Sequence, residues 1–414
     1  MASTPSKSKK LRNKPPKSRP ATTSAISQPA DASSTHSLSS FSDGGELFAF
    51  VSLAVDKHRL RVYDTVTGHS TSEHLFESSR VSSICWARFD ASQNEEGPRR
   101  KKKRRSVGAE EKLPLPGIVL GLTNGSLILY SPTHGKVART ISHSSSTSAL
   151  VSVAVVEGGS IEAMHVWTSG SDGVVRLWNM RDGSLVGSWK SEERIPYSCL
   201  AIRPGSASAS PSTTDILAAS YAIQLLSIQS SSSSSLDTPL KPHKLASFTG
   251  HASPVKLLRW QSSSRFVSVA EADRFVYLWD VPAESASTSE GRVAASIPLD
   301  SDVRTITLSS PHATPPATNT LLTVSTSGRI SVFSLEPDTA PVSTSKTKPQ
   351  VPTLSPQCTI ATPLSKQQAE ARSDVAAVSF VGMEEGKIRV VRLAGGVKPV
   401  FDVVVSPEIG FTHQ

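Results

Sequence analysis

A short strand-like motif recurs along this chain of 414 residues. Each copy alternates between apolar and polar positions, as a half-buried β-strand requires, and most copies end on an aromatic residue followed by a small polar one. The copies are LRVYD (60–64), LILYS (127–131), VRLWN (175–179), VYLWD (276–280), ISVFS (330–334) and a weaker one, IQLLS (223–227). Six copies of one pattern predict a repeat protein rather than a series of unrelated domains.

The surroundings of the motif indicate what one repeat contains. An apolar segment precedes most copies, and turn residues such as Asn124-Gly125 and Asp172-Gly173 separate the two segments. A weaker strand follows the motif, as in VARTIS (137–142), and another apolar strand opens the next unit, as in VRTITL (303–308). Four short strands in about 40 to 60 residues are typical of a propeller blade. We therefore predict an all-β fold, a β-propeller over residues 36–410.

The last repeat of the chain decides the number of blades and the closure of the ring, and it shows the pattern only in part. A seventh unit fits residues 375–405, where three strands are visible but the aromatic residue is missing. We expect its fourth strand to come from residues 36–42, because such a closure removes exposed sheet edges. This favours seven blades, with six as the alternative.

Polar stretches lengthen the repeats beyond the usual blade. Their Ser-, Pro- and charge-rich compositions bury too little apolar surface to order themselves, so we expect loops at the rims of the propeller. The stretches are 90–116 with its polybasic part 94–112, 205–214, a Ser-rich insert at 229–243 and a Pro/Ser/Thr-rich insert at 336–372.

The positive charge of the chain is concentrated in two segments. The formal net charge is +9, while residues 1–35 carry +6 and residues 94–112 carry +4. The remainder is therefore close to neutral, which argues against a propeller whose whole surface grips nucleic acid. We expect residues 1–35 to be a disordered basic tail.

A run of seven basic residues has the composition of a nuclear localisation signal or a phosphate-binding patch. No aromatic residue interrupts the run to stack on bases, so any contact with RNA would be with phosphates. A solvated loop without a partner is the remaining alternative. The run comprises Arg99, Arg100, Lys101, Lys102, Lys103, Arg104 and Arg105.

Cysteines and targeting signals indicate an intracellular location. Cys85, Cys199 and Cys358 are odd in number and share no CxxC spacing, which argues against disulfides and for a reducing compartment. No apolar stretch is long enough for a transmembrane helix, and the first forty residues lack the apolar segment of a secretory signal. The start is Lys/Pro-rich rather than Arg-rich and amphipathic, which disfavours a mitochondrial presequence.

The segments TGH (249–251) and RFVYLWD (274–280) resemble the Gly-His and Trp-Asp ends of a WD repeat. In that family a His, a turn Asp, a Ser or Thr and the Trp form a hydrogen-bonded set that stiffens a blade. The resemblance implies this architectural role for His251, Ser268, Asp273 and Trp279, and for Asp172 and Trp178, which share the six-residue spacing in the third blade.

The order of features over roughly residues 40–405 is similar to that of the single-propeller WD-repeat subunits of the UtpA complex, part of the nucleolar small-subunit processome. The segments that carry this likeness are HRLRVYDTVTG (58–68), RVSSICWARF (80–89) before the polybasic insert, LGLTNGSLILYSPTHGKV (120–137) and FTGHASPV (248–255). The helical C-terminal domain usual in such subunits does not follow within these 414 residues.

The resemblance implies a nuclear, nucleolar protein that acts in the transcription and processing of small-subunit ribosomal RNA. Its implied partners are other WD-repeat processome subunits, with no membrane involved. Precursor ribosomal RNA and importins would be bound through the basic segments.

No catalytic motif of the GxSxG, HExxH, GxxxxGK[ST] or GxGxxG type occurs, and the eleven histidines show no metal-ligand spacing. We therefore expect a non-catalytic scaffold without a cofactor or metal. The alternatives are another nuclear WD-repeat adaptor, such as a ubiquitin-ligase substrate receptor or chromatin scaffold, and a propeller hydrolase. A hydrolase would need carboxylates or histidines clustered at one mouth of the central channel.

Overall fold

A computed structural model describes most of the predicted propeller. The described residues are 38–42, 44–54, 57–89, 115–142, 148–155, 165–191, 195–205, 213–229, 240–282, 289–299, 302–308, 320–326, 328–335, 351–360, 374–380, 387–394 and 398–405. They belong to one compact unit, Thr35–Gln414. The predicted tail (1–35) and the polybasic insert (94–112) lie outside the described residues. No helix within the described ranges is long and apolar enough to cross a membrane.

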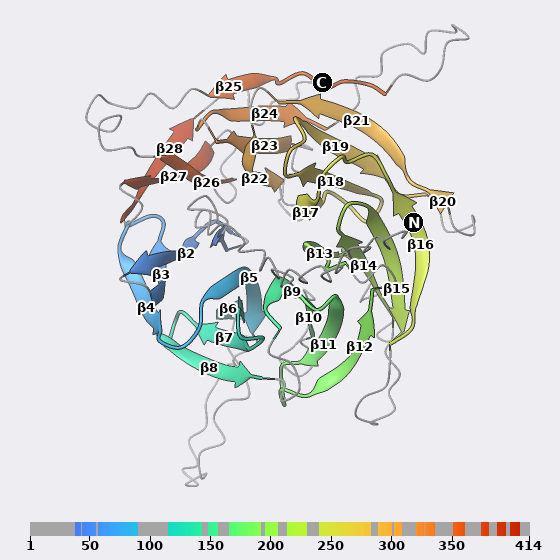
Figure 1. Cartoon of the computed structure of the whole chain (residues 1–414). Helices are drawn as coiled ribbons and strands as arrows, with labels where there is room; N and C mark the ends of the chain where they lie inside the picture. Colours follow the sequence, from blue (N-terminus) through green and yellow to red (C-terminus); the bar gives the residue numbers. More distant parts are fainter. Residues whose placement is uncertain are drawn as a thin grey trace, which may run out of the picture. The chain divides into compact units, whose positions relative to one another are not determined.

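Seven sheets follow one another along the chain and form a ring (Figure 1), which confirms the all-β propeller and its seven blades. Blade one comprises β1 (Ser39–Phe41), β2 (Leu47–Ala54), β3 (Lys57–Asp64) and β4 (Ser70–Phe76). Blade two comprises β5 (Val81–Phe89), β6 (Leu115–Leu122), β7 (Leu127–Ser131) and β8 (Lys136–Ile141). Blade three comprises β9 (Leu150–Val155), β10 (His165–Gly170), β11 (Val174–Asn179) and β12 (Leu185–Lys190).

The remaining four blades have the same antiparallel order, and a short strand, β20 (Ser289–Glu290), pairs in parallel with the outer strand of blade four. Blade four is β13 (Cys199–Ile202), β14 (Thr213–Ala219), β15 (Ile223–Gln229) and β16 (Pro242–Phe248); blade five is β17 (Val255–Trp260), β18 (Arg265–Ala270), β19 (Phe275–Asp280) and β21 (Arg292–Pro298); blade six is β22 (Val303–Leu308), β23 (Thr320–Ser325), β24 (Ile330–Ser334) and β25 (Cys358–Ile360); blade seven is β26 (Asp374–Phe380), β27 (Lys387–Ala394) and β28 (Lys398–Val405).

The hydrophobic core is divided among the seams between neighbouring blades. On β6, Ile118 and Leu120 pack against blade one, while Val119 between them packs against blade three. Successive side chains of a strand point to opposite faces of the sheet. A blade with a neighbour on each side therefore needs apolar residues at both odd and even positions of its strands. This explains why second strands such as β18 and β23, and LILYS of β7, are buried almost without interruption.

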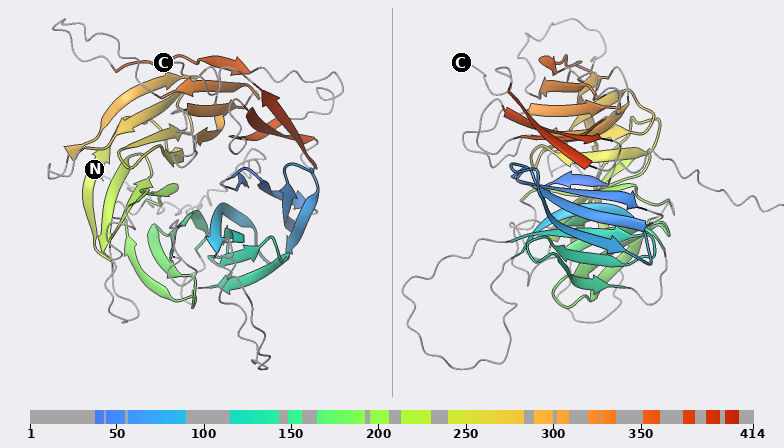
Figure 2. Two further views of the ribbon diagram at one scale, coloured as in Figure 1. Left: turned by 180° about the vertical axis from the view of Figure 1, so that it is seen from behind. Right: turned by 90° about the vertical axis from the view of Figure 1, so that its left-hand side faces the viewer.

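The ring is closed between blades seven and one by side chains. Phe48 of blade one packs with Val391 and Leu393 of blade seven, and its ring centroid is 5.9 Å from that of Phe401. Arg389, which is buried, donates a hydrogen bond of 2.9 Å from Nη1 to the carbonyl oxygen of Gly45 in blade one. Figure 2 shows the red strands of blade seven beside the blue strands of blade one from behind.

The predicted closing strand is wrong. Residues 39–41 form β1, which pairs with β2 of blade one rather than with blade seven, and the described part of blade seven has three strands. Blade one also needs a first strand, and residues 39–41 supply it, so they do not complete blade seven. Leu38 and Phe41 supply the apolar contacts of that strand.

The Pro/Ser/Thr-rich insert predicted at 336–372 contains ordered structure. Residues 358–360 form β25, the outer strand of blade six, and Thr353 forms a bridge with Ser296 of β21. An outer strand covers only the edge of its blade, so few apolar residues suffice, here Cys358 and Ile360. Its composition therefore resembles that of a loop.

The connections between strands divide the propeller into two different faces. The second and third strands of every blade are joined by two to four residues, and we call this side, with the connections between blades, the turn face. Gly125, at φ +82°, allows one such turn to be tight. The opposite side, the insert face, bears the connections between first and second and between third and fourth strands. There the chain leaves β5 at Phe89 and returns at Leu115.

The side-chain packing between blades seven and one predicts that mutations at this seam destabilise the ring. Replacing Phe48 with Ala should lower the free energy of unfolding by about 3 to 5 kcal/mol, because it leaves a cavity in the core between blades seven and one. Amide exchange of β1 and β26 should accelerate most. Val66→Ala, at an exposed turn of blade one, should change stability by less than about 0.5 kcal/mol. Uniform acceleration across all blades in Phe48→Ala would contradict the seam as the weak point.

Candidate functional site

Four residues of blade five form a buried chain of hydrogen bonds on the turn face. Trp279 donates from Nε1 to Oγ of Ser268 over 2.7 Å, and that oxygen lies 2.6 Å from Nε2 of His251. The other ring nitrogen of His251, Nδ1, lies 2.7 Å from Oδ2 of Asp273. The structure thus brings together the four residues that the WD-repeat resemblance selected.

The protonation state of His251 decides the direction of these bonds. Burial lowers the pKa of His251 and outweighs the neighbouring Asp273, whose hydrogen bond and charge act in the opposite sense. The neutral ring then donates from Nδ1 to Asp273 and accepts at Nε2 from the hydroxyl of Ser268. Both ring nitrogens, the hydroxyl and the indole N–H of Trp279 are thereby engaged with one another, which suits a structural role rather than acid-base chemistry.

The connection that carries His251 passes close to the tryptophan. Gly250 has a φ of +158°, and a Cβ atom there would lie 3.3 Å from Cη2 of Trp279. The absence of a side chain at Gly250 lets the connection between blades four and five lie against the indole ring. This contact and the hydrogen bonds fix the turn face at blade five.

Blade three has a different version of the same arrangement. Trp178 donates from Nε1 to Oγ1 of Thr168 over 2.9 Å, and Asp172 pairs with Nη2 of Arg176 over 2.6 Å. Burial, which would raise the pKa of Asp172, is outweighed by the hydrogen bond and charge of Arg176, so this pKa is lowered. Arg176 occupies the strand position that Tyr277 holds in blade five.

Sequence reasoning missed Thr168 and Arg176. The signal for Thr168 was present, because it is the fourth residue of β10 just as Ser268 is the fourth residue of β18. Arg176 had no counterpart in the motif, since the expected partner of Asp172 was a histidine. The basic run 99–105 lies outside the described residues, between β5 and β6.

The described residues hold no cluster suited to metal binding and no activated nucleophile. No group of three or more His, Cys, Asp or Glu side chains among them could hold a metal ion. Burial raises the pKa of Cys199 to about 12, so its thiol is protonated at neutral pH.

The hydrogen-bond chain of blade five predicts the effect of removing its central hydroxyl. Ser268→Ala should lower the free energy of unfolding by about 1 to 3 kcal/mol, because it leaves Nε1 of Trp279 and Nε2 of His251 without a partner in a buried site. Urea denaturation measures the loss. Ser263→Ala, at an exposed turn position of the same blade, is the control, and equal stability of both variants would show that the chain of hydrogen bonds contributes nothing.

The buried histidines predict the pH dependence of stability. Burial and the charge of Arg80 lower the pKa of His58, whose Nδ1 accepts a hydrogen bond of 3.0 Å from the backbone N–H of Val81 in the next blade. The unfolded chain therefore binds more protons below about pH 6.5, and stability falls as the pH drops through that value.

Denaturation at pH 7.5 and pH 5.5 should show a lower free energy of unfolding at the acidic pH, with a smaller difference in His58→Asn. The matched control is His243→Gln at an exposed position. A stability that rises on acidification would contradict the lowered pKa of the buried histidines.

The comparisons with known proteins agree with the geometry. No protein-family model matches the chain. U3 small nucleolar RNA-associated protein 5 of Saccharomyces cerevisiae is 22% identical over 253 residues, and the match covers 59% of this chain and 33% of that protein, about a third of its length. A chain of the "Crystal Structure of Mitotic Checkpoint Complex" has a TM-score of 0.50 at 13% identity, over 86% of each chain. The latter likeness shows the fold alone: the chain is a WD-repeat-like seven-bladed β-propeller.

Proposed function

We propose that this propeller is a non-catalytic scaffold in the nucleolar assembly of the small ribosomal subunit. The observation that carries the proposal is the match to a yeast protein named for its association with U3 small nucleolar RNA. The proposed partners are other WD-repeat subunits of the processome. The match covers 59% of this chain and 33% of the yeast protein, so these partners belong to the proposal.

The chemistry of the described surface supports a binding role. Two acidic side chains of blade five are engaged with neighbours, Asp273 with His251 and Asp280 with Arg265. Seven blades tied together at their seams provide a rigid frame with many loops. Such a frame can contact several proteins at once.

The basic run 99–105 is the proposed site of contact with precursor RNA phosphates or importins. Its flanking strands end at Phe89 and begin again at Leu115, on the insert face. Phosphate binding by several Lys and Arg residues would weaken steeply with salt, because it releases counterions from the RNA.

Purification of the tagged full chain from nuclear extract, followed by sequencing of the bound RNA, tests the proposal. We expect enrichment of the 5′ leader of precursor ribosomal RNA together with other WD-repeat processome subunits. A variant with residues 99–105 replaced by Ser should accumulate less in the nucleus, with an unchanged melting temperature. Replacing Ser230–Ser235 with Gly, in another insert, serves as the control.

Two results would contradict the proposal. Nuclear location without this RNA would identify another kind of nuclear WD-repeat adaptor, such as a ubiquitin-ligase substrate receptor or a chromatin scaffold. A clear loss of thermal stability in the variant at 99–105 would show that the run packs against the propeller, and the predicted solvated loop would then be wrong.

A further inference from the structure

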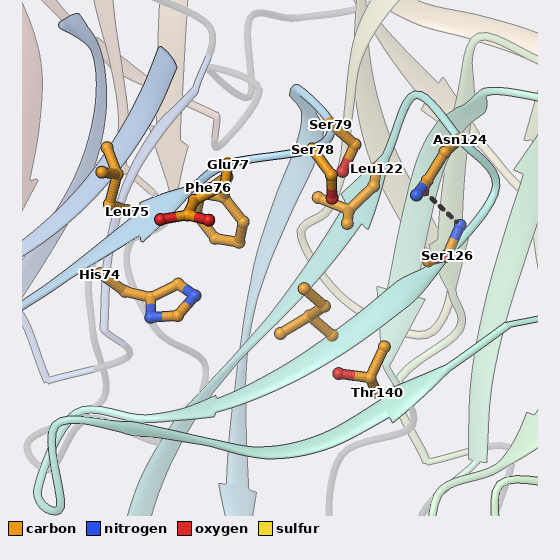
Figure 3. Close-up of a pocket in the computed structure, with 11 residues that line it drawn as sticks. His74, Leu75, Phe76, Glu77, Ser78, Ser79, Leu122, Asn124, Ser126 and Thr140 are labelled. Atoms are coloured by element: carbon orange, nitrogen blue, oxygen red, sulfur yellow. Dashed lines mark hydrogen bonds between the residues drawn. The ribbon is translucent and has the colours of Figure 1, made fainter.

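A hollow of about 230 Å³ lies where the outer strand of blade one meets blade two (Figure 3). Its lining combines apolar and polar side chains from four strands, β4, β6, β7 and β8, and from two connections. On one side stand His74 and Glu77, and on the other Asn124 and Ser126. The other lining residues are Leu75, Phe76, Ser78, Ser79, Leu122, Ile128 and Thr140.

The base of the hollow is apolar and rigid. Phe76, Leu122 and Ile128 are buried members of the core between blades one and two. The ring of His74 packs against Phe76 at 4.8 Å and Tyr130 at 5.7 Å between ring centroids. Burial lowers the pKa of His74, so at neutral pH its ring adds no positive charge to the hollow. A ligand group with an apolar stem would find matching contacts here.

The rim of the hollow carries acceptors and one negative charge. Glu77 is the only acidic residue of the lining, it is exposed, and it makes no ion pair with another described residue. Asn124 accepts a hydrogen bond of 3.0 Å from the backbone N–H of Ser126, which fixes its side chain at the opposite rim. No lysine or arginine lines the hollow. The charge of the site therefore complements a cation.

We propose that this hollow binds an arginine side chain of a partner protein. The guanidinium group would pair with the carboxylate of Glu77 and donate to hydroxyl oxygens such as that of Ser79, while its methylene stem would lie on Phe76 and Ile128. A guanidinium group suits the site better than an ammonium group, because its planar fork of five donors reaches several acceptors at once and its faces pack on aromatic rings. A phosphate or an acidic peptide would be repelled by Glu77.

The test uses the full chain and a defined probe, N-acetyl-L-arginine amide. The probe N-acetyl-L-citrulline amide has nearly the same shape without the charge. The isoleucine methyl signals are followed by NMR, and the signal of Ile128 is assigned with Ile128→Val. We expect the arginine probe to shift this signal in a saturable way at millimolar concentrations, and the citrulline probe to bind at least tenfold more weakly.

Two variants separate a specific site from a general attraction. Glu77→Gln should weaken binding of the arginine probe at least fivefold with an unchanged melting temperature, because Glu77 is exposed. Glu271→Gln, an exposed acidic residue in blade five, should leave binding unchanged.

Three outcomes would each overturn the proposal. They are equal binding of both probes, unchanged binding by Glu77→Gln, and the absence of any saturable shift. None of them bears on the nucleolar role, which is tested by the bound RNA.

Discussion

Burial of both faces of every sheet is the constraint on which this structure depends. Each blade is stable only between two neighbours, because Ile118 and Val119, adjacent on one strand, belong to different cores. The ring must therefore be complete, and the last seam has to be as apolar as the others. Phe48, Val391 and Leu393 meet that requirement, and the buried Arg389 adds hydrogen bonds to blade one.

The constraint also explains what the sequence predicted well. The third strand of a blade carries regularly spaced apolar residues and, in most copies, an aromatic residue near its end, so LILYS and VYLWD identify their blades without further information. Outer strands carry little of this signal. The strand β25 has three residues in a Pro/Ser/Thr-rich stretch, so it was hidden by its length and composition.

The candidate sites were predictable to different degrees. A six-residue spacing selected Asp273 and Trp279, because the spacing is set by one turn and one strand. Arg176 replaces a histidine by different chemistry, and no spacing rule includes it. The hollow at Glu77 is assembled from segments of two blades, between His74 and Thr140, whose closeness exists only after the blades have packed.

The closure between blades seven and one has a mechanical consequence. Within a blade, strands are held by ladders of backbone hydrogen bonds, whereas side-chain packing and the bonds of Arg389 join the first and last blades. A force pulling blade one away from blade seven would therefore separate this seam before it tore any sheet. In a large assembly that exerts force on its subunits, the propeller would open at the seam between blades seven and one and close again when the force is removed.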